Sequence, residues 1–334
     1  TMASHQNEKE ILRGLKKRAH HHWVPPMLAT LTEDYFSDPN WIYEEKFDGM
    51  RCIAMKKKGK VTLYSRNERN INHVFPEIVQ DLEDRESKDY VVDGEIVSLN
   101  EEGVSSFSTL QNRMNVKDIR NIKGKIPKVY YYLFDMLYWD EYDLKGLPLI
   151  FRKQLLKHFF PFTSKVRYTT HVKEKGLALF KKAAKKGWEG IIAKRGNSHY
   201  VSKRSRDWLK FKCVIGQELV IGGYTNPQGS RKDFGALLVG YYDHKNRLHY
   251  AGKVGTGYSF QTLETLGAKL RRLKTEKCPF STVPKEKGAH WVKPQLVGEV
   301  DFTEWTRDGK LRHPRFKGVR MDKSAKSIKR EKAR

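Results

Sequence analysis

The segment that decides the fold lies early in the chain and reads Tyr43-Glu44-Glu45-Lys46-Phe47-Asp48-Gly49-Met50-Arg51. In an extended strand, alternate side chains point to the same face. We therefore predict that Glu44, Lys46 and Asp48 share one face. The opposite face then carries Tyr43, Glu45 and Phe47. Gly49 predicts a sharp bend that brings Arg51 back towards the same site. A plain surface salt-bridge strip also sets a lysine between two carboxylates, so this segment alone leaves both interpretations open.

Four further segments set charged or aromatic side chains in apolar, strand-like runs. They read Tyr90-Val91-Val92-Asp93-Gly94-Glu95-Ile96-Val97, Leu133-Phe134-Asp135-Met136-Leu137, Glu189-Gly190-Ile191-Ile192-Ala193-Lys194-Arg195 and Trp208-Leu209-Lys210-Phe211-Lys212. Asp93 and Glu95 share one face of their strand, where charges seldom lack a partner or a metal. Lys210 and Lys212 also share a face, which suits a polyphosphate or a solvated edge strand. Phe134 offers a ring for stacking on a base, with a core phenylalanine as the alternative.

Short β-rich and helical runs alternate between Trp41 and Cys213. We predict strands that include 60–65, 90–99 and 129–139, and helices at 75–85, 149–160 and 173–187. This mixture indicates an α+β domain with mixed or antiparallel sheets. Beyond it, short strands at 218–224, 235–243, 247–254 and 295–306, with one helix at 259–273, predict a small β-barrel of the OB type.

These patterns divide the chain into four parts. The first, 1–22, is a basic lead-in of helical character, of which Thr1-Met2-Ala3-Ser4-His5 is set aside as a candidate cloning remnant. Ordered structure is expected from about Trp23, with an α+β domain over 23–213 and an OB-fold domain over 214–323. The basic tail, 324–334, is expected to fray.

The charge balance favours a polyanionic partner. Lysine plus arginine number 65 against 39 acidic residues, which gives a net charge of +26. Neutralising phosphates releases their condensed counterions, so nucleic acid is the expected partner, with a solubility role as the alternative. No apolar run is long enough to span a membrane. Cys52, Cys213 and Cys278 are far apart, so neither a disulfide framework nor a zinc site is indicated, and a reducing cytoplasm fits. We treat His20-His21-His22 as incidental.

In their order, these segments resemble the motifs of the covalent nucleotidyltransferase superfamily, which comprises DNA ligases, RNA ligases and mRNA capping enzymes. Lys46–Arg51 is similar to its first motif, K-x-D-G-x-R. The other matching segments are Ser65-Arg66-Asn67 (motif Ia), Asp93-Gly94-Glu95 (III), Phe134-Asp135 (IIIa), Glu189-Gly190 (IV), Lys210-Phe211-Lys212 (V) and Leu311-Arg312-His313-Pro314-Arg315-Phe316-Lys317-Gly318-Val319-Arg320-Met321-Asp322-Lys323 (VI). The last of these looks like that of ATP-dependent DNA ligases.

Within that superfamily the chain most resembles the ligase domain of bacterial end-joining ligase D. Pro26–Leu31, Gly103–Phe107 and Leu110-Gln111-Asn112-Arg113 carry this likeness. The chain lacks the polymerase and phosphoesterase domains of that family, so an excised domain and a stand-alone relative both stay open. The resemblance implies an adenylation domain followed by an OB-fold domain.

The resemblance also implies a reaction. Lys46 would take AMP covalently from ATP, with Mg²⁺ or Mn²⁺, and pass it to a DNA 5′-phosphate, so that a 3′-hydroxyl seals the nick. Lys46 must be neutral to attack, and its reference pKa is about 10.4. Burial and neighbouring cations such as Arg51, Lys210 and Lys212 would lower it.

Roles for the other residues follow from the same resemblance. The catalytic set is Lys46, Asp48, Arg51, Lys210 and Lys212. Nucleotide binding is expected from Lys46 itself, Glu44 (adenine amino group), Phe134 (adenine stacking), Arg51, Arg66, Glu95, Glu189, Lys194, Lys210 and Lys212. Metal support is expected from Asp48, Glu95 and Glu189, pyrophosphate alignment from Arg320, Asp322 and Lys323, and DNA contact from Arg66, Arg315 and Lys317.

Several alternatives and partners complete the sequence-based picture. An RNA ligase or a GTP-dependent capping guanylyltransferase shares the lysine chemistry, and a non-catalytic nucleic-acid-binding module belongs to a different class. An NAD-dependent ligase is disfavoured, because zinc-finger cysteines are absent. We expect a cytoplasmic, nucleoid-associated monomer that acts on nicked double-stranded DNA in repair, recombination or non-homologous end joining. A Ku-like end-binding partner is expected only by analogy.

Overall fold

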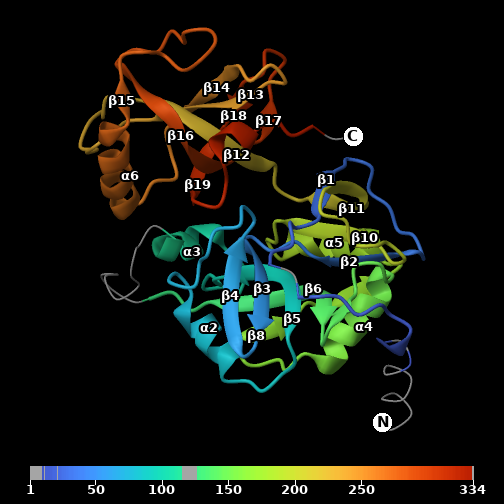
Figure 1. The fold of residues 1–334 in the computed structure, drawn as a ribbon. Helices are drawn as coiled ribbons and strands as arrows, with labels where there is room; N and C mark the ends of the chain where they lie inside the picture. The colour runs from blue at the N-terminus through green and yellow to red at the C-terminus, as the bar shows by residue number, and fades with distance from the viewer. Residues whose placement is uncertain (1–9, 11, 21, 115–125, 333–334) are drawn as a thin grey trace. The chain divides into compact units, whose positions relative to one another are not determined.

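The computed structural model describes residues 10, 12–20, 22–114 and 126–332. The chain divides between Cys213 and Val214 into two compact units (Figure 1). Both units are sheets with a few helices, which confirms the α+β class. Thr1–His5 and His21 lie outside the described residues.

The first unit contains two sheets. The five-stranded sheet consists of β1 (Leu28–Leu31), β11 (Arg204–Lys212), β10 (Gly190–Arg195), β2 (Trp41–Glu45) and β9 (His171–Lys173), in that order. The six-stranded sheet consists of β4 (Lys60–Ser65), β3 (Met50–Lys57), β5 (Tyr90–Val97), β6 (Tyr130–Trp139) and β7 (Tyr142–Asp143), with β8 (Val166–Tyr168) beside β6. Valine, isoleucine and aromatic residues dominate these strands, and they suit a pleated surface that is buried on both faces.

The two sheets share a core, and helices cover their outer faces. Ile53 on β3 and Val91 on β5 pack in one cluster with Trp208 on β11. Three helices pack on the outer face of the six-stranded sheet: α2 (Pro76–Glu83), α3 (Phe107–Met114) and α4 (Leu149–Phe159). On the outer face of the five-stranded sheet, α5 (Gly176–Lys185) packs through Ala183.

The second unit is one antiparallel sheet with a helix. Its strands are β14 (Leu248–Val254), β13 (Leu237–Tyr242), β12 (Gly216–Thr225), β16 (Ala289–Asp301) and β15 (Lys274–Thr275), with β19 (Arg315–Arg320) beside β16. Two short strands, β17 (Glu304–Trp305) and β18 (Leu311–Arg312), pair with each other. The helix α6 (Phe260–Arg272) begins at Ser259, whose side chain accepts a hydrogen bond from the Thr262 amide. This arrangement agrees with the predicted OB-like domain.

Several element boundaries differ from the prediction. The helix predicted at 173–187 is shorter, because His171–Lys173 form the edge strand β9 and α5 begins only at Gly176. A Cβ at Gly176 would lie 2.4 Å from the Tyr43 ring, so the helix can approach β2 only with glycine there. Neither α3 nor β19 was among the elements predicted from periodicity.

Both predictions about the chain ends are wrong for the described residues. Leu12 is buried in the core of the first unit, and Lys17 forms a β-bridge with Tyr142, so ordered structure begins before Trp23. At the other end, a 3₁₀ turn (Ala325–Ser327) leads to Ile328, which is buried and whose carbonyl accepts a hydrogen bond from the Tyr242 amide. Each of these two segments is ordered because it buries an apolar side chain, Leu12 in the first unit and Ile328 in the second.

Candidate active site

Lys46 lies in the loop between β2 and β3, with its amine beside a carboxylate. Its Nζ is 2.5 Å from Oε1 of Glu189, and its amide donates to the Gly190 carbonyl at 3.0 Å. Both charged side chains are largely buried, 17% and 14% exposed. The structure thus brings motifs I and IV together, as the resemblance implied.

The predicted strand through Lys46 and Asp48 is wrong. β2 ends at Glu45, and the chain bends at Asp48 and Gly49 before β3 begins. A Cβ at Gly49 would lie 2.3 Å from the Ile96 carbonyl oxygen, so only glycine fits there. Asp48 therefore lies outside the strand. Its carboxylate accepts from the Phe107 amide at 3.1 Å, at the N-terminus of α3, where a negative charge is favourable.

Glu44 lies between two lysine side chains in the interior of the first unit. It is 2% exposed, and its oxygens lie 2.6 Å from Nζ of Lys153 on α4 and 2.6 Å from Nζ of Lys194 on β10. Burial opposes ionisation, yet the two ammonium groups hold the pKa of Glu44 below its ordinary value. Burial in turn lowers the pKa of Lys194 to about 8, against the attraction of Glu44.

Sequence reasoning missed Lys153, although a signal was present. α4 buries Leu149, Arg152, Lys153 and Leu156, which is the i, i+3, i+4, i+7 pattern of a helix face. Two cations on an apolar stripe require buried partners. Arg152 has one in Asp135, which it contacts at 2.8 and 3.0 Å, and Lys153 has one in Glu44.

Phe134 lies between the sheets rather than on an open surface. Its ring is 8% exposed, 4.1 Å from Nζ of Lys194 and 4.9 Å from Cζ of Arg51. Trp208 meets it edge-on at 6.0 Å, and the Trp208 Nε1 is buried without a hydrogen-bond partner among the described residues. Phe134 is therefore buried beside residues predicted to bind the nucleotide, and its stacking on adenine stays a prediction.

Arg51 is fixed by Asp93, a partner that the sequence did not reveal. Asp93 is fully buried and accepts two hydrogen bonds from Arg51, both 2.6 Å, and one from the Tyr200 hydroxyl at 2.7 Å. Burial alone would lower the pKa of Arg51, but the attraction of the Asp93 carboxylate outweighs it, so the pKa of Arg51 is raised. Glu95, half-buried two residues along β5, lies opposite Arg51 in the strand pairing.

The lysines of β11 share a face with Glu44. Lys210 pairs in register with Ile192, which in turn pairs with Glu44, and Lys212 pairs with Gly190. The alternate residues Leu209 and Phe211 lie in the core on the other face, as predicted from period two. Arg66, also predicted, lies half-buried in the turn after β4.

The predicted motif VI residues form a buried ion-pair cluster in the second unit. Arg320 contacts Asp322 through two bonds of 2.9 Å and Glu299 at 2.9 Å, while Lys323 lies 3.0 Å from Glu218. Burial disfavours the charged forms of both side chains. The attraction between Arg320 and its carboxylate partners outweighs burial, so the pKa of Arg320 is raised and the pKa of Asp322 is lowered. Arg315 on β19 is exposed, and Lys317 lies 3.8 Å from Asp301.

The described ranges contain neither a three-residue cluster of potential metal ligands nor a membrane-spanning helix. Within 10, 12–20, 22–114 and 126–332, no three His, Cys, Asp or Glu side chains gather as metal ligands. In the same residues, no helix is long and apolar enough to cross a membrane.

Comparisons with known proteins identify a family. A model described as ATP dependent DNA ligase domain matches residues 26–212, and one described as ATP dependent DNA ligase C terminal region matches 230–323. The multifunctional non-homologous end joining protein LigD of Pseudomonas aeruginosa is 37% identical over 317 residues, which cover 93% of this chain and 37% of that protein. LigD of Mycobacterium tuberculosis H37Rv is 37% identical over 314 residues, or 92% of this chain and 40% of that protein.

Solved structures give the same answer. A mycobacterial DNA ligase D complexed with ATP and MES has a TM-score of 0.68 and 35% identity, covering 92% of this chain and 98% of that one. The ligase domain of M. tuberculosis LigD has a TM-score of 0.52 and 36% identity with the same coverage. The chain spans about two fifths of the length of the curated LigD relatives.

Proposed function

Since this chain belongs to the ATP-dependent DNA ligase family, we propose that Lys46 is the residue that carries AMP between ATP and the DNA. The observation that supports this role is the 2.5 Å contact between Nζ of Lys46 and Glu189, at the start of β10, whose neighbour β11 carries Lys210 and Lys212. A nucleophilic amine beside a carboxylate and several cations suits attack on a polyphosphate.

The chemistry proceeds in three displacements. The Lys46 amine attacks the α-phosphorus of ATP, a P–N bond forms, the bond to the β-phosphate oxygen breaks and pyrophosphate leaves, while Glu189 accepts the amine proton. A DNA 5′-phosphate oxygen then displaces Lys46 to give a DNA-adenylate. Finally the 3′-hydroxyl attacks that 5′-phosphate, the phosphodiester forms and AMP departs. Positioning and charge stabilisation dominate such reactions.

The cations of β11 are suited to provide that stabilisation. Lys210 and Lys212 share one face of β11 and are suited to bracing the α-phosphate. Glu95 and Glu189 are the oxygen donors that would take Mg²⁺ or Mn²⁺, which neutralises phosphate charge when it is bound with ATP. Asp48 is a weaker candidate for that role, because its carboxylate caps α3.

The nucleotide preference rests on the family rather than on one contact. Glu44 and Lys194, 2.6 Å apart between the sheets, set a hydrogen-bond acceptor beside a donor, which can pair with either purine. Both matching family models are described as ATP dependent DNA ligase regions, which supports ATP over GTP and disfavours a capping guanylyltransferase.

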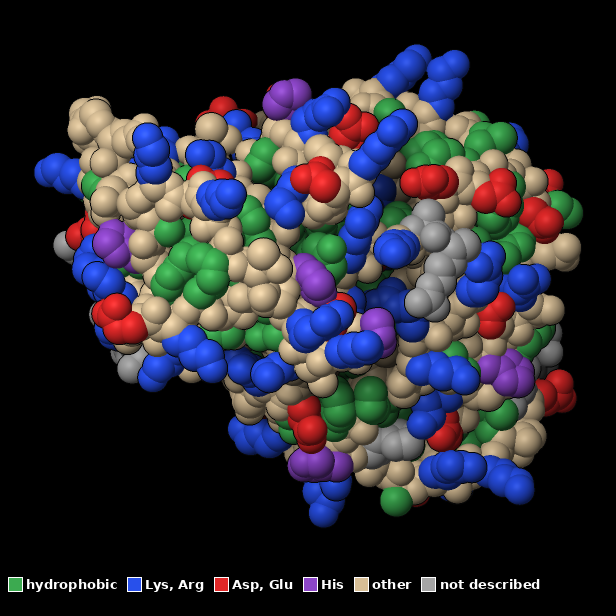
Figure 2. Space-filling view, turned by 90° about the horizontal axis from the view of Figure 1, so that it is seen from above, with side chains coloured by type: hydrophobic (Ala, Val, Ile, Leu, Met, Phe, Trp, Pro, Cys, Tyr) green, Lys and Arg blue, Asp and Glu red, His purple; other side chains and the backbone are tan. Residues whose placement is uncertain are grey.

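Positive charge covers much of the molecule and suits a DNA substrate. Figure 2 shows Lys and Arg side chains spread over the visible face with fewer acidic ones between them, in keeping with the net charge of +26. We propose nicked duplex DNA as substrate and, from the names of the LigD relatives, a role in non-homologous end joining. A Ku-like partner and a cytoplasmic, nucleoid-associated setting stay proposals made by analogy.

A four-way sealing assay tests this function. Nicked DNA and nicked RNA duplexes are each incubated with ATP or GTP. We expect joining of nicked DNA with ATP alone. Efficient joining of RNA, or any joining that requires GTP, would contradict the proposed substrate and nucleotide.

A further inference from the structure

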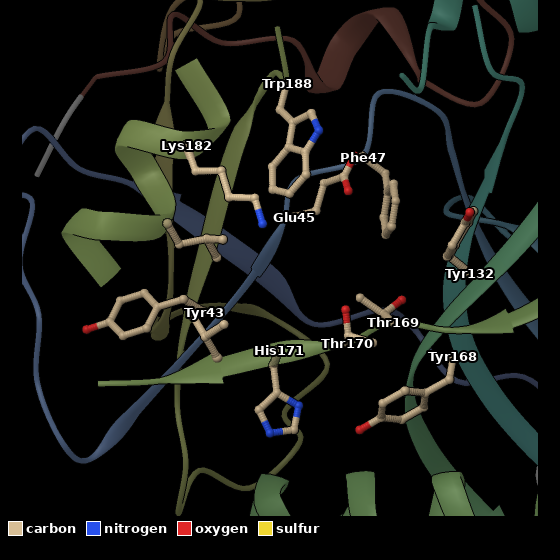
Figure 3. A pocket seen from close by; sticks show the side chains of 12 residues that line it. Tyr43, Glu45, Phe47, Tyr132, Tyr168, Thr169, Thr170, His171, Lys182 and Trp188 are labelled. Atoms are coloured by element: carbon tan, nitrogen blue, oxygen red, sulfur yellow. The ribbon is translucent and has the colours of Figure 1, made fainter. Parts of the chain in front are cut away.

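The first unit contains a pocket beside β2, on the side to which Glu45 points. It has a volume of about 180 Å³ and lies between β2, α5 and the segment that enters β9 (Figure 3). Five aromatic side chains line it: Tyr43, Phe47, Tyr132, Tyr168 and Trp188. Phe47 and Tyr132 stack on each other at 4.5 Å. Tyr43, Glu45 and Phe47 thus line one pocket, although Phe47 follows the end of β2.

One buried polar atom in the wall of this pocket has no protein partner among the described residues. Thr169 is 2% exposed, and its hydroxyl oxygen is buried without a hydrogen bond. Figure 3 shows the side chains of Glu45 and Lys182 reaching into the same space. Buried polar atoms are normally paired, so the Thr169 hydroxyl indicates a ligand with hydrogen-bonding groups.

The size and lining of the pocket identify the class of ligand. Pockets for drug-sized molecules measure roughly 300–1,000 Å³, so this one holds a single ring system. Aromatic walls with hydrogen-bonding atoms are how proteins bind unstacked nucleobases. Lys182 lies at the pocket, and Lys186 is 5.8 Å from the Trp188 ring, so cations for a strand phosphate are at hand.

We propose that this pocket binds a single unstacked nucleobase, supplied by an unpaired nucleotide of the DNA substrate. The inference rests on the ligase function, and it adds a site that the joining reaction at a paired nick does not need. Glu45 and Phe47 flank Lys46 in the chain, so the unpaired base would be held next to the adenylylated loop. The ligase would then retain ends that carry an unpaired base.

The test compares the affinity of the full chain for two nicked duplexes. One is fully paired, and the other carries an extra, unpaired 2-aminopurine nucleotide at the nick. Stacking on protein rings is worth about 5- to 150-fold per base, so we expect the unpaired duplex to bind tighter within that range, with quenched fluorescence. Trp188→Ala should remove most of this preference.

Thr169→Val gives the sharper variant, because it replaces an unpaired hydroxyl by a methyl group of the same shape. It should leave stability and sealing of the paired nick unchanged, yet reduce the preference for the unpaired base by about 2- to 10-fold. Phe151→Ala, an exposed aromatic on α4 outside the pocket, is the matched control and should keep the preference.

Three results would overturn the proposal. They are equal affinity for both duplexes, an unchanged preference in Trp188→Ala and Thr169→Val, and capture of free 2-aminopurine riboside without preference for the unpaired DNA. Sealing of the paired nick by the wild-type protein is measured in parallel, so failure of the ligase function is distinguished from failure of the pocket.

Discussion

In the proposed reaction, Lys46 must lose a proton before its amine attacks phosphorus, and the Glu189 carboxylate, 2.5 Å away, is in position to accept it. The order of motifs in the sequence implied that motifs I and IV meet, and the structure brings them together. Other contacts depend on partners distant in sequence: Asp93 fixes Arg51, and Asp48 turns to α3. For Lys153, which holds Glu44, the apolar stripe of α4 was a signal that a buried partner exists, but not which one.

Glu189→Gln tests the role of that carboxylate. The amide keeps the size of the side chain but cannot take a proton, so transfer of AMP from ATP to the enzyme should slow by about 10²- to 10⁴-fold. Single-turnover labelling measures this rate, and affinity for nicked DNA should stay the same. Glu141→Gln, an exposed acidic residue, should retain the wild-type rate. A wild-type rate in Glu189→Gln would remove Glu189 from the mechanism.

At the scale of elements, period-two and helical patterns located most strands and helices within a few residues. They failed where tertiary contacts decide the conformation. β2 stops at Glu45 and Gly49 packs against the Ile96 backbone, while α5 starts late because His171–Lys173 pair with β2 as the sheet edge. Neither contact is local, so neither is encoded in a short window of sequence.

The attachment of α4 to the five-stranded sheet depends on Lys153. Lys153→Met leaves Glu44 buried with one cation instead of two, which should lower the free energy of unfolding by about 2–4 kcal/mol. Lys157→Met on the exposed face of the same helix should change it by less than about 0.5 kcal/mol. Urea unfolding gives both values, and equal effects would show that the buried pairing is unimportant.

The edge strand β9 makes stability depend on pH. Burial, and after it Lys153, lowers the pKa of His171 from 6.5 to about 4. Between those values the unfolded chain binds a proton that the folded protein does not, so the free energy of unfolding falls as pH drops from 6.5 to 4. Over this window, the free energy of unfolding of His171→Leu should fall by up to about 3 kcal/mol less than that of the wild type. His199→Leu, an exposed histidine, should behave as wild type; identical curves for His171→Leu and wild type would contradict the shift.

At the scale of the whole molecule, charge dominates. A surface that neutralises six to ten phosphates loses roughly 10³- to 10⁵-fold in affinity between 50 and 200 mM salt. With a net charge of +26, binding of nicked duplex DNA should follow this steep dependence. Titrations by fluorescence anisotropy at several salt concentrations measure the slope. An affinity that stays flat over this range would mean that the positive surface does not track the duplex.

The central claim is that Lys46 carries AMP, and one measurement tests it most directly. Wild-type protein and Lys46→Ala are stripped with pyrophosphate, incubated with α-labelled ATP, digested and mapped by peptide. We predict label on the peptide that contains Lys46 in the wild type, no label in Lys46→Ala, and loss of the label when nicked duplex DNA is added. Label on another peptide, or label that persists in Lys46→Ala, would contradict the account.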